Sequence, residues 1–338
     1  MTTLFHAASP GRRRLLKTAA ASAAVAASAA VLAPRAFAQT RKLTFAWNAN
    51  AICLSPALVA LERGFYERNG LDVELVNFTG STDQLLESLA TGKADAGVGM
   101  IHRWLKALES GFDVKIVGST HGGCGRLVGS TAAGVTELAD LRGKTIGVAD
   151  MTAPSKNFFS IYLKKRGIDP ERDVQWRQFP ADLLDVAVEK GEIQAIADGD
   201  PNLYLIEKRR PGQFATLATY LSEEYADKVC CIVGVRGELV RKDRKLVASL
   251  TRAVIQASDF VADNPNETAA IFSKYAPKAT QEDLRQILGS LTHSHHPAGT
   301  DLLKEIEFYA QDFRSIGVFK QSTDPQRFAR HVYADVLS

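Results

Sequence analysis

The segment His121-Gly122-Gly123-Cys124-Gly125-Arg126 carries the densest group of chemically capable side chains in this sequence. Imidazole and thiol groups can donate to an anion, ligate a metal, or act as base and nucleophile. Arg126 can pair with a carboxylate, sulfonate or nitrate oxygen. The glycines allow close approach of the backbone to a bound group, although a tight turn is their commonest use. His102 follows a predicted strand, and we expect it to face the same cleft.

Polar side chains also follow two other predicted strands, 145–148 and 193–197. Thr152 and Ser155 flank Pro154, where a hydroxyl can cap a helix and the free backbone N–H groups favour an anion, so both are predicted ligand contacts. A plain helix cap is the alternative for Thr152. Asp198 and Asp200 form an acidic pair that suits an amine or a cation better than a simple anion. Because of this acidic pair, a zwitterionic ligand remains one of the alternatives.

Trp47 closes the first predicted strand and precedes Asn48 and Asn50. The indole ring could form one wall of a pocket or lie in the core, and neither reading is favoured. The amide of Asn48 can both donate and accept hydrogen bonds, so Asn48 is the better candidate for ligand contact, with Asn50 in the same loop.

His293, His295 and His296 form the one cluster with metal-ligand character in the sequence, and His102, His121 and Cys124 could complete a transition-metal site. Their spacing repeats no known metal motif, so a solvated loop ahead of Pro297 is the preferred interpretation. We therefore predict no metal and no cofactor.

The four cysteines fit neither a disulfide scaffold nor a CxxC zinc framework. In an oxidising compartment one pair could be bridged. Cys230 and Cys231 should not pair with each other, because neighbouring residues of a strand point to opposite faces.

The first 38 residues have the three parts of a secretory leader. Arg12-Arg13-Arg14-Leu15-Leu16-Lys17 resembles a twin-arginine signal, and an apolar stretch leads to Ala36-Phe37-Ala38. Thr18–Leu32 is short and rich in Ala and Ser for a membrane anchor, the competing interpretation. Cleavage removes five positive charges and changes the net charge from +3 to −2. We expect a periplasmic protein of 300 residues, with no basic surface to indicate nucleic-acid binding.

Strands and helices alternate along the rest of the chain, which predicts parallel sheets flanked by helices. The predicted elements of the first unit are 42–47, 57–69, 71–77, 82–91, 94–100, 103–110 and 114–119. Those of the second unit are 145–148, 154–166, 174–179, 183–190, 193–197 and 229–235. Helices fill most of the chain after Arg241.

Ligands of open parallel sheets gather beyond the carboxyl ends of the strands. The predicted strand ends fall at 47–55, 100–103, 120–126, 150–157 and 198–202. If the helical tail packs back on the first unit, the chain crosses twice between two lobes, near 129–134 and near 230–234. The predicted organisation is a leader over 1–38, lobe one over 41–130 and 234–338, and lobe two over 131–233.

Four stretches together resemble one known family. They are PALVALERGFYERNGLDVELVNF (56–78), QLLESLATGKADAGVG (84–99), LADLRGKTIGV (138–148) and VAVEKGEIQAIA (186–197). They look like the periplasmic solute-binding proteins of ABC importers for nitrate, sulfonate and taurine, a family with pyrimidine-precursor-binding relatives. The resemblance implies a type II periplasmic-binding-protein fold, with two α/β lobes that close on a ligand.

The resemblance further implies a small anionic or zwitterionic solute, delivery to a membrane permease with its ATPase subunits, and a monomer. The alternative is an enzyme on the same fold, similar to pyrimidine-precursor synthases or dependent on a metal. The cysteine-rich iron motif of those synthases is absent, as are G-x-S-x-G and H-E-x-x-H. We therefore expect a binding protein and not an enzyme.

Overall fold

The computed structural model describes residues 42–78 and 82–338. The predicted leader lies outside the described residues. Among those that are described, no helix combines the length and apolarity needed to cross a bilayer.

The first sheet has five strands in the order β2-β1-β3-β10-β4. β1 pairs in parallel with both β2 and β3, whereas β10 runs antiparallel between β3 and β4. The strands are β1 (Lys42–Trp47), β2 (Asp72–Asn77), β3 (Ala96–Met100), β4 (Val114–His121) and β10 (Cys231–Arg236). β1 and β3 are almost wholly buried, as expected of strands covered on both faces.

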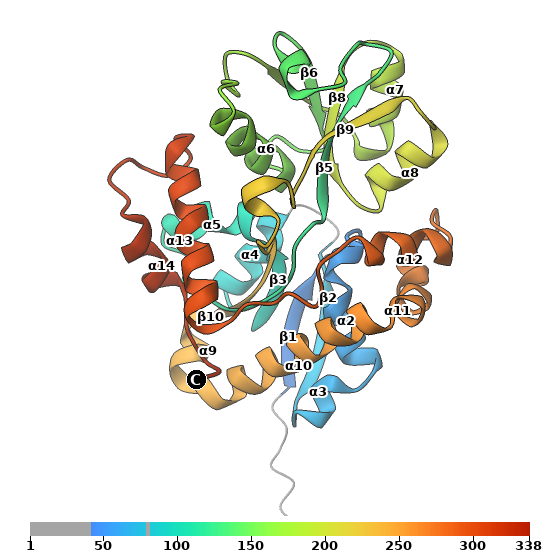
Figure 1. The fold of residues 1–338 in the computed structure, drawn as a ribbon. Coiled ribbons are helices and arrows are strands. Elements are labelled where there is room, and N and C mark those ends of the chain that lie inside the picture. The colour runs from blue at the N-terminus through green and yellow to red at the C-terminus, as the bar shows by residue number, and fades with distance from the viewer. Residues whose placement is uncertain (1–41, 79–81) are drawn as a thin grey trace, which may run out of the picture. The chain divides into compact units, whose positions relative to one another are not determined.

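Helices from both ends of the described chain surround this sheet (Figure 1). The helical tail packs back on it, because α10 contacts α2, α3 and β4. The helices are η1 (Ile52–Leu54), α2 (Ser55–Glu62), α3 (Phe65–Arg68), α4 (Thr82–Ala90), α5 (Ile101–Glu109), α9 (Gly237–Lys242), α10 (Arg244–Asp263), α11 (Pro265–Phe272), η5 (Ser273–Tyr275), α12 (Gln281–Gly289), α13 (Gly299–Ser315) and α14 (Pro325–Val332).

The second sheet repeats this plan in the order β7-β6-β8-β5-β9, with β5 antiparallel to both neighbours. Its strands are β5 (Gly125–Ser130), β6 (Thr145–Val148), β7 (Gln175–Gln178), β8 (Ala195–Gly199) and β9 (Phe214–Thr219). Its helices are η2 (Leu138–Leu141), α6 (Pro154–Lys165), η3 (Ala181–Leu183), α7 (Leu184–Glu189), α8 (Asn202–Arg209) and η4 (Glu223–Tyr225). The predicted fold class, two α/β units with mostly parallel sheets, is confirmed.

The first crossing between the sheets comes earlier than predicted. β4 ends at His121 in the first sheet and β5 begins at Gly125 in the second, so residues 122–124 make the crossing rather than 129–134. The return runs from the end of β9 to the start of β10, just ahead of the predicted 230–234. The strand pairing thus assigns Gly125–Ser130 to the second sheet, whereas the predicted boundary had assigned it to the first lobe.

Some elements differ from their sequence prediction. The helix predicted over 57–69 is split into α2 and α3, because Gly64 takes a left-handed φ of 66° between them. β5, β9 and α8 were not predicted. β5 has the sequence GRLVGS, and its two glycines hide the strand pattern.

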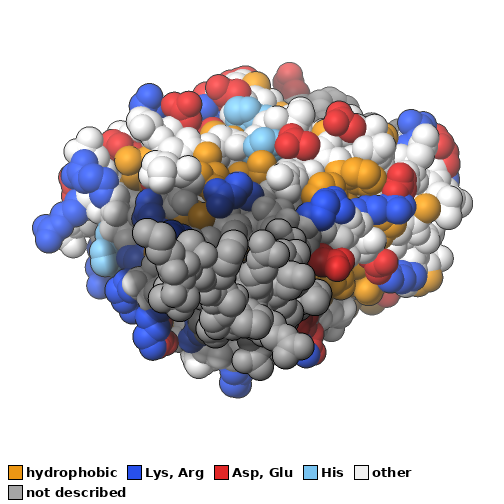
Figure 2. Space-filling model, turned by 90° about the horizontal axis from the view of Figure 1, so that it is seen from below, with side chains coloured by type: hydrophobic (Ala, Val, Ile, Leu, Met, Phe, Trp, Pro, Cys, Tyr) orange, Lys and Arg blue, Asp and Glu red, His pale blue; other side chains and the backbone are white. Residues whose placement is uncertain are grey.

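Charged side chains of both signs occur on the described part of the face in Figure 2, with hydrophobic groups between them. This mixture agrees with the small net charge of the chain.

Trp104 of α5 is fully buried against glycines of two adjacent strands. A Cβ atom at Gly99 of β3 would lie 2.6 Å from the indole, and one at Gly234 of β10 would lie 2.2 Å from it. The indole therefore occupies the space that side chains would take on these strands, which packs α5 tightly against the sheet.

We predict that Gly234→Ala lowers the free energy of unfolding by about 1–3 kcal/mol, since the new methyl group overpacks the indole. Gly289→Ala in α12 is the matched control, because a Cβ there meets no atom within 4 Å. This control should be neutral or stabilising by about 0.5–1 kcal/mol. Urea unfolding measures both, and equal stabilities would contradict the packing argument.

Candidate functional site

A cavity of about 290 Å³ is lined by residues from both sheets. It is close to the lower end of the range for ligand pockets, about 300–1,000 Å³, and suits a small solute. The lining residues are Asn48, Asn50, Ala51, Cys53, Met100, Arg103, Cys124, Ala149, Asp150, Ala153, Pro154, Ser155, Ala181, Asp198, Gly199, Asp200, Asn202 and Tyr220.

The cavity lies where the sequence predicted a ligand site, beyond the carboxyl ends of strands. Asn48 and Asn50 follow β1, Asp150 follows β6, and Asp200 follows β8. Ser155 lies in the first turn of α6, where several backbone N–H groups have no intrahelical partner. Such a helix terminus favours a negatively charged group of a ligand.

One ion pair joins the two sides of the cavity. Arg103 of α5, whose side chain is 4% exposed, lies 3.2 Å from Asp150 on the second-sheet side. The same guanidinium donates to the backbone carbonyl of Thr152. Nearby, the amide of Asn157 in α6 donates to the backbone carbonyl of His102 at 3.0 Å. These bonds hold the α6 end of the second unit against α5 of the first.

A second arginine neutralises Asp200. Arg126 of β5 donates to Asp200 at 2.7 Å and also pairs with Glu207 of α8. The Asp200 carboxylate in turn accepts from the backbone N–H of Tyr204 at 3.0 Å. Arg126 is therefore committed to two acidic partners of its own chain and does not line the cavity.

Asp198 has a different environment. Its carboxylate accepts a 2.7 Å hydrogen bond from the amide of Asn202, and no lysine or arginine of the described chain pairs with it. Burial first, and then the nearby negative charge of Asp200, raise the pKa of Asp198 to about 6. The cavity therefore contains one carboxylate without a compensating cation.

The structure brings six of the eleven predicted contact residues to the cavity, and they are Asn48, Asn50, Cys124, Ser155, Asp198 and Asp200. Trp47 is not among them. Its ring is 1% exposed and packs edge-on against Phe272 and Tyr275, so the core reading holds for this residue. Thr152 does not line the cavity either, because its hydroxyl donates to Asp150.

His102 does not face the cleft, contrary to the prediction. It lies in the first turn of α5 and points into a cluster of four aromatic rings, those of Phe158, Tyr220, Tyr309 and Phe313. Neither ring nitrogen has a hydrogen-bond partner in this structure. Burial lowers the pKa of His102 to about 4, so the ring is neutral.

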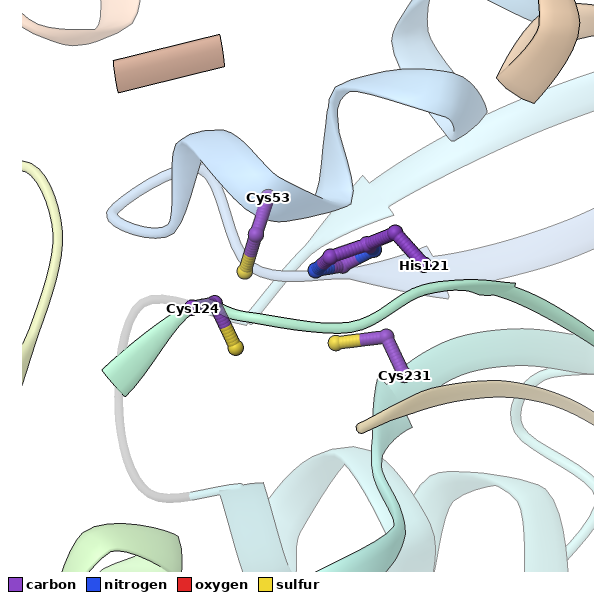
Figure 3. A group of neighbouring side chains, drawn as sticks. All are labelled: Cys53, His121, Cys124 and Cys231. Carbon is purple, nitrogen blue, oxygen red and sulfur yellow. The ribbon is translucent and has the colours of Figure 1, made fainter. Parts of the chain in front are cut away.

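His121 also lies away from the cavity, in a buried cluster with the cysteines behind Cys53 and Cys124 (Figure 3). Burial opposes its charge, but the neighbouring Cys230 thiolate outweighs this and raises the pKa of His121 to about 10. The four cysteines are free, and the 3.9 Å between the Cys230 and Cys231 sulfurs agrees with the prediction that these two do not pair.

The three histidines predicted to share a solvated loop are separated in the structure. His293 is 1% exposed and stacks on His121 with ring centres 4.5 Å apart, so the solvated reading is wrong for this residue. Burial lowers the pKa of His293 to about 3. His296 instead contacts Asp259 at 2.7 Å, and His295 lies 3.8 Å from Glu305.

Several lining residues were not named as candidates from the sequence. Four of them lie within the predicted strand-end segments, and they are Cys53, Arg103, Asp150 and Asn202. Their position in the sequence therefore indicated the cavity, although their residue types did not single them out. Tyr220 lies outside those segments. It comes directly after β9, which was not recognised as a strand.

Comparison with known proteins agrees with this architecture. A family model described as NMT1/THI5 like matches residues 53–268. A "putative binding protein" of Brucella abortus is 27% identical over 219 residues, which cover 64% of this chain and 66% of the relative. A 4-amino-5-hydroxymethyl-2-methylpyrimidine phosphate synthase of Saccharomyces cerevisiae is 24% identical over 72% of this chain and 74% of its own length.

Two solved structures share the fold at low identity. The alkanesulfonate-binding protein SsuA of Xanthomonas axonopodis, bound to MOPS, has a TM-score of 0.72 at 16% identity and matches over 88% of this chain and 99% of its own. The periplasmic nitrate-binding protein NrtA of Synechocystis has a TM-score of 0.71 at 16% identity, over 88% and 87% of the two chains. The expected periplasmic-binding-protein fold is thereby confirmed.

We predict that Asp198→Asn stabilises the protein at pH 7.5 by about 1–3 kcal/mol, the order expected of a pKa near 6 in the folded state and 3.8 in the unfolded state. The folded protein binds the Asp198 carboxyl proton more tightly than the unfolded protein does. Protonated Asp198 therefore contributes stability in full below about pH 4, and this contribution is lost as the pH rises through about 6.

Urea unfolding at pH 4, 5, 6 and 7.5 provides the check. The advantage of the variant should shrink as the pH falls and vanish near pH 4. A constant difference at all four pH values would show that the charge of Asp198 is not its source.

Proposed function

The chain belongs to the NMT1/THI5-like family, and from this membership and the cavity we propose that it is the solute-binding component of an ABC import system. The observation that carries the proposal is one cavity lined by strand ends of both sheets. Contacts to both sides of such a site can form together only when the two units close, so a solute favours the closed arrangement.

The arrangement across the cavity supports closure on a solute. Arg103 and Asp150, which both line the cavity, connect its two sides. Each unit also supplies its own lining groups, such as Asn48 from the first and Ser155 from the second. The second unit, which runs from β5 to β9, would then move against the first unit around the two crossings.

The charges in the cavity support a zwitterionic solute. Asp198 lacks a cationic partner, so an amine of the solute can supply one. The start of α6 at Ala153–Ser155 lies on the same cavity and suits an anionic group such as a sulfonate or carboxylate. A plain inorganic anion such as nitrate would leave Asp198 uncompensated.

The same proposal includes export to the periplasm by the twin-arginine route, as a monomer that delivers solute to a permease and its ATPase subunits. It also includes the absence of catalysis. The alternative, an enzyme similar to the pyrimidine phosphate synthases, is supported by distant relatives of that name. No feature of the cavity favours it over solute capture.

We expect taurine to raise the melting temperature of the purified protein more than ethanesulfonate does. The two compounds share a sulfonate, and only taurine has the amine that can pair with Asp198. Differential scanning fluorimetry over a concentration series measures the shift, which should grow with ligand through mass action. Nitrate and an aminopyrimidine complete the panel.

Asp198→Asn should reduce the affinity for taurine by about 10–100-fold, the range of a lost charge-assisted hydrogen bond. Asp301→Asn is the control, since that side chain is 79% exposed and is not among the lining residues. A taurine shift no larger than that of ethanesulfonate would refute the zwitterion class. Failure of every compound, together with turnover of the aminopyrimidine, would refute the binding function itself.

Affinity for an amine-bearing solute should also depend on pH. Asp198 has a raised pKa of about 6 and attracts an amine only when ionised, so affinity should fall as the pH decreases from 7.5 to 5. Isothermal titration calorimetry gives this dependence, and in Asp198→Asn the affinity should be flat over the same range. A stronger affinity at pH 5 would contradict the assignment.

A further inference from the structure

All four cysteines of the chain converge on one buried cluster, although up to 178 residues separate them. Cys53 lies in η1, Cys124 in the first crossing, Cys230 just before β10 and Cys231 at its first residue. His121, the last residue of β4, joins them. Figure 3 shows the side chains of Cys53, His121, Cys124 and Cys231 pointing toward a common centre.

The donor atoms of this cluster lie at distances suited to a shared ion. One donor atom from each of Cys53, His121, Cys124 and Cys231 lies within 4.8 Å of all the others. Ligands held tetrahedrally by Zn²⁺, with Zn–S bonds of about 2.3 Å, are about 3.7 Å apart. Small side-chain rotations therefore suffice to close the set around a metal.

The types of ligand are as informative as their spacing. Three thiols and one imidazole form a Cys₃His set, one of the combinations found at structural zinc sites. Thiolates select soft cations such as Cu⁺ and Zn²⁺ over Mg²⁺ or Ca²⁺. His293, which stacks on His121, adds a buried imidazole whose two nitrogens have no hydrogen-bond partner in this structure.

Two other accounts of the cluster compete with a metal. Buried cysteines can act as small apolar side chains, but that role requires neither His121 nor the convergence of all four thiols. A disulfide is the stronger competitor, since the sulfurs of Cys124 and Cys230 lie 2.9 Å apart, against about 2.05 Å for a bond. It would leave Cys53, Cys231 and His121 together without a role.

We propose that Cys53, His121, Cys124 and Cys231 bind one thiophilic d¹⁰ metal ion, Zn²⁺ or Cu⁺. The ion lies at the wall of the solute cavity, because Cys53 and Cys124 line it while His121 and Cys231 are behind them. Its ligands come from η1, the end of β4, the first crossing and the start of β10. The metal therefore ties the first crossing to three elements of the first unit.

The predicted export route is compatible with this site. Thiols remain reduced in the cytoplasm and become oxidised outside it. A twin-arginine leader belongs to a route that carries folded proteins, so the ion can be bound before the thiols meet an oxidising compartment. A bound metal then protects the cysteines from disulfide formation. The proposal does not depend on the identity of the solute.

The first experiment measures metal binding by the purified protein, prepared reduced and metal-free under nitrogen. Zn²⁺ is titrated against a chromophoric chelator, and Cu⁺ against bicinchoninate, which separates the two ions. We expect one ion per chain, and a Co²⁺ form with the intense visible absorption of tetrahedral thiolate coordination. The metal should also raise the melting temperature in a concentration-dependent way.

Matched variants then test the ligand set. His121→Gln should weaken the affinity for the preferred ion by at least about 100-fold, since loss of second-shell partners alone costs about 10–100-fold. His296→Gln, which removes a histidine that contacts Asp259 outside the cluster, should bind normally. Cys124→Ser should weaken the thiolate bands of the Co²⁺ form, because only two of the three thiolate ligands remain.

Two results would overturn the proposal, and both come from the unaltered protein, so a variant that fails to fold cannot obscure them. One is failure of the reduced protein to bind either ion stoichiometrically. The other is a thiol titration that finds only two reactive cysteines in the unfolded protein isolated without reductant, together with peptide mapping that assigns the disulfide to Cys124 and Cys230. Four thiols and bound metal in the same preparation would support the site.

Discussion

The chain must pass between its two sheets twice, and this constraint organises the rest of the molecule. Each passage contributes the antiparallel strand of the sheet that it enters, β5 in one case and β10 in the other. The passages run side by side, since the backbone N–H of Cys230 donates to the carbonyl of His121. Both passages reach the cavity, because Cys124 of the first and Tyr220 of the second are among its lining residues.

The polar groups around the cavity divide into paired and unpaired charges, and the division assigns their roles. Arg103 and Asp150 face each other across the two units, and Arg126 and Asp200 brace β5 against the loop after β8. In both pairs the charges are neutralised by a partner within the protein. Asp198 has an amide as its partner and a raised pKa, and for this reason we propose that its charge is available to a solute.

Much of the fold followed from local pattern. The alternation of strands and helices, the glycine stops and the positions of β1, β3, β4, β6, β8 and β10 were predictable, because burial on both faces gives short apolar runs. β2 was predictable from its alternation of apolar and polar residues. The strand-end rule also located the cavity in general terms. β5 escaped prediction because its two glycines weaken its intrinsic strand character, and β9 was not recognised although Phe214 and Thr216 favour a strand. The first crossing was therefore placed several residues too late.

The sequence by itself determined the fold class, the family and the segments from which the cavity is built, because these depend on periodicity and on residues close together in the chain. Only the tertiary structure decided which side chains meet. His102 and Trp47 entered the core, since helix orientation and strand facing turn them away from the cavity. The tertiary structure also brings His121 together with Cys53, Cys124 and Cys231. The chain crossings place these residues side by side, although nothing in their sequence spacing indicates that they are in contact.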